Sequence, residues 1–265
     1  MNTPVSVTGS VSPAALRLRV VLVGTQHPGN IGAAARALKT MGLARLVLVA
    51  PEDYPAEEAY RRAAGADDLL GDAPVVATLA EAVADCHLVL GCTARSRRVQ
   101  LEEHAPRQAA ALAVGRVAAG GEVALVFGRE RTGLSNEELQ LCHAAVHIPA
   151  NPEYSSLNLA AAVQVLAYEL RLAMLEDAPA AVALAAHPDD ASASHAHMEG
   201  FFAQLGETLD AIDFHKGRTP DSAMRKLRRL FAKADLTEQE VRLLRGILAD
   251  TQRMARLAQA GGKDS

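Results

Sequence analysis

From Leu18 onward, short apolar runs rich in Val and Leu alternate with longer Ala-rich segments, and this alternation constrains the fold more than any other feature. Short apolar runs between turn residues indicate buried strands, and the Ala-rich segments indicate helices. Buried strands that alternate with helices predict an α/β domain, a parallel sheet with helices on both faces. The predicted strands are 18–23, 46–49, 88–90, 123–127 and 144–148, and the predicted helices are 31–41, 106–117, 136–142 and 157–175.

Changes in composition divide the 265 residues into parts. A stretch of Ala, Pro, Asp and Ser without an amphipathic stripe indicates a linker after the α/β domain. Apolar residues at helical spacing follow it and predict a small all-helical C-terminal extension. The expected parts are a flexible lead (1–15), the α/β domain (16–176), the linker (177–194), the helical extension (195–257) and a flexible tail (258–265).

Composition excludes several classes of protein. No apolar stretch approaches the ~20 residues needed to cross a bilayer, and the first 15 residues lack the basic and apolar regions of a secretory signal. The three cysteines form no CxxC pair, which fits a reducing compartment, so we expect a cytoplasmic protein. Aromatic residues make up only 3% of the chain, too few for a platform that stacks RNA bases.

The formal charge of −4 hides a basic stripe near the C-terminus. Residues 214–233 hold seven basic side chains against the single acidic Asp221. Such a stripe is typical of a surface that binds a phosphate backbone, and it is equally typical of a solvated helix face.

Familiar nucleotide and metal motifs are incomplete. Gly128 and Gly133 have the spacing of a P-loop, but Leu134 stands where the phosphate-binding Lys is required. The glycines after the first predicted strand miss the GxGxxG spacing, so a dinucleotide-binding dehydrogenase is disfavoured. Histidines near Cys142 and at 195–197 lack a full ligand set, and we expect no metal site.

Three segments carry polar side chains that a purely structural role does not explain. They are residues 30–36, 127–135 and 148–159, and each lies where a predicted strand leads into a helix. Close helix packing, a solvated turn or a helix start would account for each segment alone. Because the carboxyl ends of parallel strands meet at one edge of a sheet, we expect the three to form a single crevice.

The same segments carry a family resemblance. NIGAAARALKTMG (30–42), LVFGRERTGLSNEEL (125–139) and IPANPEYSSLNLAAAVQVLAYE (148–169) resemble, in this order, the three signature motifs of the SpoU branch of the SPOUT RNA methyltransferases. The resemblance covers about residues 17–175, and it is greatest to tRNA enzymes that methylate the ribose 2′-hydroxyl of the pyrimidine at position 32 in the anticodon loop. It implies a C-terminal trefoil knot in the α/β domain, S-adenosylmethionine as cofactor, and a homodimer with the 157–175 helix at the interface.

The resemblance also implies which residues hold the cofactor. Backbone groups of three loops would bind S-adenosylmethionine in the knot. Those positions are Cys92, Thr93, Ala94, Gly128, Ile148, Ser155, Ser156 and Leu157.

The catalytic residues implied by the resemblance are Arg36, Asn30, Glu130 and Asn158. A guanidinium is a poor base, so we expect Arg36 to clamp a phosphate and stabilise the developing alkoxide. Asn30 would fix its loop or contact the ribose, and Glu130 would orient Arg36 or Arg129. Asn158, with Ser156, would bind substrate or close the pocket; Glu130 and Asn158 also suit a bracing role.

Arginine and lysine side chains on both parts of the chain are expected to bind tRNA, mainly through phosphates. They are Arg95, Arg97, Arg98, Arg129 and Arg131 in the α/β domain, and Lys216, Arg218, Arg225, Lys226, Arg228 and Arg229 in the extension. Two other functions stay open: a 2′-O-methyltransferase for ribosomal RNA or another tRNA position, and a non-catalytic RNA-binding protein on the same scaffold.

Overall fold

The computed structural model describes residues 15–94, 101–177, 192–216 and 220–261. The chain divides into two compact units, one of residues 1–83 with 88–184 and one of residues 84–87 with 185–265. The elements of the first unit are η1 (Ala15–Arg17), β1 (Leu18–Val23), α1 (Pro28–Thr40), β2 (Leu46–Val49), α2 (Glu57–Ala63), α3 (Asp67–Gly71), β3 (Val75–Val76), α4 (Leu79–Val83), β4 (Leu88–Cys92), β5 (Glu103–His104), α5 (Pro106–Ala118), β6 (Val123–Phe127), α6 (Asn136–Gln140), β7 (Ala144–Val146) and α7 (Leu159–Asp177).

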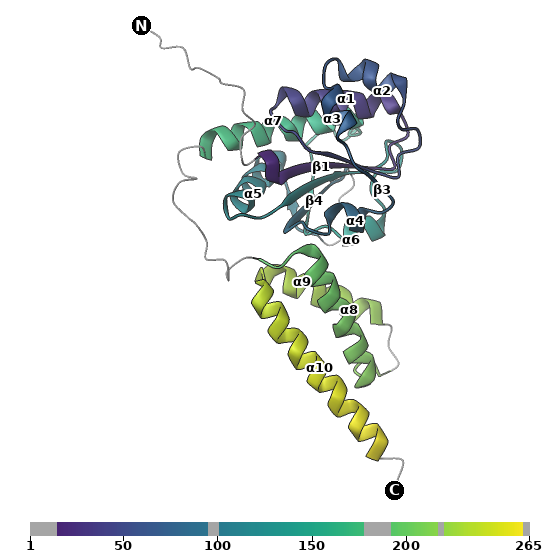
Figure 1. Ribbon diagram of the computed structural model, residues 1–265, viewed down its shortest axis with the longest axis vertical. Helices are drawn as coiled ribbons and strands as arrows, with labels where there is room; N and C mark the ends of the chain where they lie inside the picture. The colour runs from purple at the N-terminus through teal and green to yellow at the C-terminus, as the bar shows by residue number, and fades with distance from the viewer. Residues whose placement is uncertain (1–14, 95–100, 178–191, 217–219, 262–265) are drawn as a thin grey trace. The chain divides into compact units, whose positions relative to one another are not determined.

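A seven-stranded sheet forms the centre of the first unit, in the order β3-β2-β1-β6-β4-β7-β5, and all its pairings are parallel. Helices α1 and α7 lie on one side of the sheet, and α4 and α6 lie on the other (Figure 1). The predicted α/β class is therefore confirmed. The trefoil knot stays a prediction.

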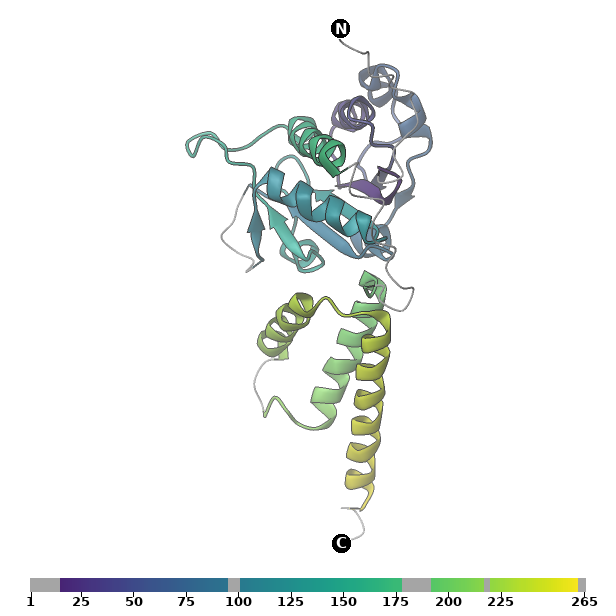
Figure 2. The ribbon, with the colours of Figure 1, turned by 90° about the vertical axis from the view of Figure 1, so that its left-hand side faces the viewer.

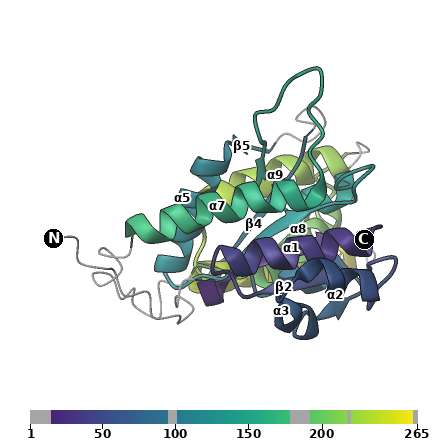
Figure 3. The same cartoon turned by 90° about the horizontal axis from the view of Figure 1, so that it is seen from above.

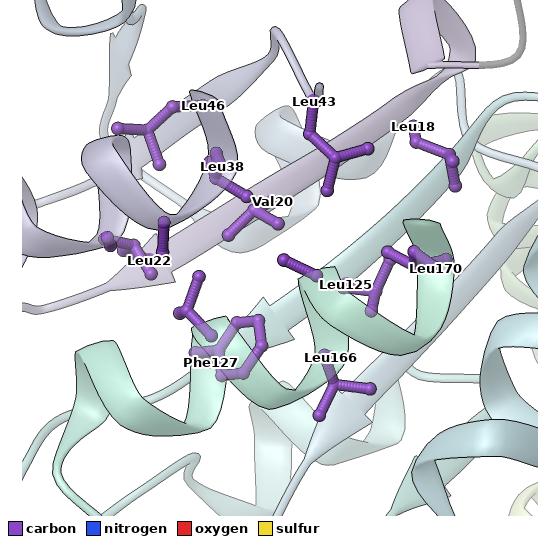
Figure 4. Close-up of a cluster of buried hydrophobic side chains, with 14 of the residues drawn as sticks. Leu18, Val20, Leu22, Leu38, Leu43, Leu46, Leu125, Phe127, Leu166 and Leu170 are labelled. Atoms are coloured by element: carbon purple, nitrogen blue, oxygen red, sulfur yellow. The ribbon is translucent and has the colours of Figure 1, made fainter. Parts of the chain in front are cut away.

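Alternate residues of the central strands supply the core on the side of α1 and α7. Leu18, Val20 and Leu22 of β1 point the same way because side chains alternate along a strand. They meet Leu38 of α1 and Leu166 of α7, and all five are 3% exposed or less (Figure 4). This packing fixes α1 and α7 side by side over the sheet, as Figure 3 shows.

Most predicted bounds lie within three residues of the observed ones. Helix α1 begins at Pro28 instead of Ile31, because proline is favoured in the first helical turn. Strand β7 ends at Val146, two residues before the predicted end. The short elements α2, α3, α4, β3 and β5 were not predicted, since two to seven residues carry too little periodicity.

The second unit contains α8 (His195–Ala211), α9 (Pro220–Ala234) and α10 (Glu238–Gly261), which confirms a helical C-terminal region. Helices α8 and α10 run alongside each other (Figure 2). Phe201 and Phe202 of α8 are buried. The Phe201 ring packs edge-on against the Phe231 ring, with 4.9 Å between the ring centroids. In the described part of the chain, no helix is both long and apolar enough to span a membrane.

Candidate active site

Three strands of the sheet end level with one another. Cys92, the last residue of β4, pairs with Phe127 of β6 on one side and with Val146 of β7 on the other. The amide of Thr93 continues this register, because it donates to the Val146 carbonyl at 3.0 Å. The segments predicted to hold the cofactor, which follow these strands, therefore start from one edge of the sheet.

The turn after β6 depends on two glycines. A Cβ on Gly128 would lie 2.1 Å from the carbonyl carbon of Gly133, so no other residue fits at position 128. Gly133 has a φ of +70°, which favours glycine. The amides of Arg129 and Gly133 donate to each other's carbonyls at 3.2 and 2.8 Å, and they close the turn.

Glu130 projects from this turn to the start of α1. Its carboxylate accepts hydrogen bonds from the amides of Gln26 (3.0 Å) and His27 (3.3 Å) and from Nδ2 of Asn30 (2.9 Å). The first amides of a helix lack partners and attract negative charge, and His27 supplies no side-chain cap. Glu130 thus binds the two amides that directly precede α1, and the Asn30 side chain in its first turn, from a segment about a hundred residues away.

The pKa of Glu130 reflects two opposing effects. Partial burial alone would raise it, but the hydrogen bonds from Asn30, Gln26 and His27 stabilise the carboxylate, and the net result is a pKa below the ordinary value. Glu130 is therefore ionised at neutral pH.

Asn158 joins the third segment to the first. Its Nδ2 donates to Oδ1 of Asn30 at 3.0 Å, and its own Oδ1 accepts from the amides of Ala160 (2.9 Å) and Ala161 (3.4 Å) at the start of α7. Asn30, Glu130 and Asn158 form one hydrogen-bonded network, called here the motif network. It brings together three of the four predicted catalytic residues.

Arg36, the fourth predicted catalytic residue, is not part of the motif network. Six residues after Asn30, Arg36 lies about 240° further around α1, and its side chain is exposed. It lines a hollow of about 260 Å³ together with Lys39, Thr40 and residues 63–66. The partners of Glu130 in the structure are Asn30 and the two amides, rather than Arg36 or Arg129 as expected.

Both arginines of the turn after β6 are among the predicted RNA contacts, but their surroundings differ. The guanidinium of Arg129 is half-buried and pairs with Glu138 at 3.0 Å. Arg131 is exposed. Of these two, Arg131 offers the accessible charge.

The predicted RNA contacts of the second unit also differ in exposure. Arg228 is held internally, because its Nη2 donates to Glu199 at 2.9 Å and its guanidinium lies 4.4 Å from the centre of the Phe202 ring. Arg225, Lys226 and Arg229 are exposed on α9. Arg95, Arg97, Arg98 and Arg218 lie outside the described residues.

The predicted cofactor residues have the chemistry that an adenosyl group requires. Ala94, Ile148 and Leu157 offer apolar contacts, Thr93 and Ser155 offer hydroxyls, and a pocket of this kind combines apolar walls with few polar groups. Burial, followed by the nearby Cys142, raises the pKa of Cys92 well above its ordinary range, so Cys92 is a neutral thiol and not a nucleophile. Ser156 is exposed and belongs to the segment between β7 and α7. This segment forms a long loop (Figure 3). When bound, S-adenosylmethionine would supply an electrophilic methyl group.

Sequence reasoning missed the backbone and carboxylate partners of this site. Nothing in the sequence links the amides of Gln26 and His27 to Glu130. Ser135 and Glu138 form a capping box at the start of α6, in which Glu138 accepts from the Ser135 amide at 2.7 Å, and this role follows from their spacing of three residues. The second role of Glu138, as partner of Arg129, has no local signal.

Comparisons with known proteins cover both units. Residues 17–168 match the model of the SpoU rRNA Methylase family, and residues 196–260 match the model described as "tRNA methyltransferase TrmJ, C-terminal domain". A protein of Pseudomonas aeruginosa named tRNA (cytidine/uridine/adenosine-2′-O-)-methyltransferase TrmJ is 48% identical over 245 residues, 91% of this chain and 95% of its own length. The Yersinia enterocolitica protein named tRNA (cytidine/uridine-2′-O-)-methyltransferase TrmJ is 46% identical over 248 residues, 94% of this chain and 96% of its own length.

Two solved structures that resemble this chain are likewise those of a TrmJ protein and of a probable methylase. The crystal structure of TrmJ from Z. mobilis ZM4 has a TM-score of 0.74 at 35% identity, and the match covers 88% of this chain and 97% of that one. A probable methylase family protein from Haemophilus influenzae has a TM-score of 0.58 at 41% identity, over 91% and 98% of the two chains. The chain therefore belongs to the SpoU methylase family, within its TrmJ group of tRNA 2′-O-methyltransferases, which use S-adenosylmethionine as methyl donor.

Proposed function

We propose that this enzyme methylates the ribose 2′-hydroxyl of the pyrimidine at position 32 in the anticodon loop of cytoplasmic tRNA, and that it acts as a homodimer. The observation that carries the site of reaction is the motif network, because it links all three signature segments beside the edge where the predicted cofactor loops begin.

Asn30 is well suited to hold the target ribose. A side-chain amide has two N–H donors and two acceptor lone pairs. One donor is used by Glu130 and one lone pair by Asn158, so one of each remains. A hydroxyl is both donor and acceptor, and the 2′-hydroxyl therefore matches the remaining half of the Asn30 amide. Asn30 thus orients the hydroxyl oxygen for attack.

The other predicted catalytic residues have supporting roles. Glu130 and Asn158 fix the Asn30 amide from both sides, and Ser156 lies on the exposed loop that precedes Asn158. Arg36 binds a phosphate of the RNA chain, since a permanently charged guanidinium suits phosphate better than it suits proton removal.

We assign phosphate contacts to Arg131 in the first unit and to Arg225, Lys226 and Arg229 on α9, because these side chains are exposed. Arg228 is removed from this set, since Glu199 and Phe202 already hold it. Contacts to phosphate orient the RNA without reading its sequence.

The target position is tested with tRNA transcripts and labelled S-adenosylmethionine. A transcript with ribose at position 32 should accept one methyl group, and a matched transcript with 2′-deoxyribose at that position alone should accept none. Label incorporated equally into both transcripts would reject position 32. The names of the two relatives differ over adenosine, so transcripts with each of the four bases at position 32 define the base preference.

The homodimer is tested at α7. Tyr168 and Leu175 are exposed by 49% and 55% on this helix, and exposed apolar side chains of this size often mark an interface. Sedimentation equilibrium should give about twice the chain mass of 27.9 kDa. The Tyr168→Glu, Leu175→Glu double variant should sediment as a monomer, whereas an unchanged dimer would remove α7 from the interface.

A further inference from the structure

We propose that Arg129 is a positioning residue that holds Glu130 against the start of α1, and that Arg129 does not contact RNA. This role rests on the function proposed above and adds a residue to its catalytic arrangement. Three sets of contacts carry it.

The first set joins Arg129 to α6. Its Nη1 lies 3.0 Å from both carboxylate oxygens of Glu138. The same carboxylate accepts from the Ser135 amide at 2.7 Å, and it therefore belongs to the N-terminal cap of α6. The Arg129 side chain is 36% exposed and that of Glu138 is 16% exposed, so the pair is better shielded than an ordinary surface ion pair.

The second set places Arg129 across the end of β1. A Cβ built on Gly24 would lie 2.7 Å from Nε and 3.0 Å from Cγ of Arg129. The arginine side chain therefore occupies the space that a larger residue at position 24 would fill. Gly24 comes two residues before Gln26, whose amide donates to Glu130.

The third set fixes the backbone between the two side chains. The paired hydrogen bonds of Arg129 with Gly133 close the turn, and Glu130 follows Arg129 directly. Holding the Arg129 side chain between Gly24 and Glu138 therefore fixes the point from which Glu130 reaches Asn30. Displacing this point moves the carboxylate and, through it, the Asn30 amide.

An RNA phosphate would have to displace Glu138 to take Nη1 of Arg129. Arg131 has no such competitor among the residues that the structure describes, and it is exposed two positions along the same turn. The two arginines therefore form a matched pair, one that positions and one that binds RNA.

The experiment compares Arg129→Met with Arg131→Met in the full-length enzyme. Misplacing a reactive group by about 1 Å can cost about a hundred-fold in rate, so Arg129→Met should lower kcat by about ten- to a hundred-fold. Its KM for tRNA, and the slope of log affinity against log salt, should stay as in the parent. Arg131→Met should show the reverse: kcat near the parent value, a raised KM, and a salt slope smaller by about one.

A second measurement does not depend on the RNA target. Hydrogen exchange at the amides of Gln26 and His27 should quicken in Arg129→Met, because their carboxylate acceptor is no longer held in place. In Arg131→Met it should stay unchanged. A parent enzyme that leaves position 32 unmodified would overturn the proposed target, and the exchange result would still decide the role of Arg129.

Two outcomes would overturn the positioning role: a reduced salt slope in Arg129→Met with kcat preserved, or unchanged exchange at both amides. Glu138→Gln provides an independent check, because it weakens the ion pair and retains one oxygen for the Ser135 amide. It should reproduce the kcat defect of Arg129→Met. A Glu138→Gln enzyme with the kcat of the parent would also count against the role.

Discussion

The Asn30→Asp substitution replaces the side-chain nitrogen of Asn30 with an oxygen and leaves the side-chain volume almost unchanged. The Asn30 Nδ2, which donates to Glu130 at 2.9 Å, becomes a second carboxylate oxygen. Two full charges at that distance repel by about 6 kcal/mol at an effective dielectric constant of about 20. Glu130 is partly exposed, so solvent screening reduces the penalty to about 3 kcal/mol.

The repulsion makes the variant's stability depend on pH. A penalty of about 3 kcal/mol corresponds to about two pKa units, so the repulsion raises one pKa of the carboxyl pair in the folded state. A pKa raised in the folded state stabilises the protein below the unfolded-state value, and this stability is lost as the pH rises through the folded-state value. The deficit in free energy of unfolding should therefore be small at pH 4, grow by about 1.4 kcal/mol per pH unit, and level off above about pH 6.5.

Tyrosine fluorescence during urea unfolding reports on the first unit alone. All four tyrosines lie there, at positions 54, 60, 154 and 168, and the chain has no tryptophan. The double variant Asn30→Asp, Glu130→Gln should recover most of the lost stability at pH 8, because one donor and one carboxylate face each other again. A deficit that does not vary between pH 4 and pH 8 would refute the proximity of Asn30 and Glu130 on which the estimate rests.

Three further predictions concern other parts of the chain. Gly32→Ala should lower the free energy of unfolding by about 3 kcal/mol in the same fluorescence assay. The reason is that the new Cβ would lie 1.9 Å from the Ala59 carbonyl oxygen and force α1 away from α2. A variant as stable as the parent would contradict that packing. Arg228→Met should destabilise the helical unit by about 1–2 kcal/mol, measured by circular dichroism. Lys226→Met should leave the stability unchanged and reduce the salt slope of tRNA binding by about one. The opposite pattern would make Lys226 the structural residue and Arg228 the RNA contact. Burial raises the pKa of Cys142 to about 12, so this thiol should react with a disulfide reagent at pH 8 only after the protein unfolds. Reaction of Cys142 in the folded protein would contradict its burial.

The sequence predicts the parts of the site that depend on local pattern. Strand ends are set by short apolar runs, and helix starts are set by caps such as Ser135 with Glu138, which the structure contains. Because parallel strands end at a common edge, the sequence also indicates that the segments after β1, β6 and β7 lie together.

Contacts between distant segments could not be predicted in the same way. Glu130 and Asn30 are a hundred residues apart, and no periodicity says which of several polar groups a carboxylate will meet. Charge alone likewise did not separate Arg129 and Arg228, which are paired with Glu138 and Glu199, from Arg131, which is exposed. Only packing shows which cations already have a partner.

The motif network also sets an order during synthesis, because it cannot form before Asn158 has been added to the chain. Asn158 bonds to Asn30 across 128 positions, and it supplies the cap for the first turn of α7. A nascent chain that has emerged only as far as Glu130 can pair β1 with β6, but the Asn30 amide still lacks one of its two anchors. A truncated translation product that ends just before Asn158 would therefore carry all seven strands without an oriented Asn30, and it should be inactive as a methyltransferase.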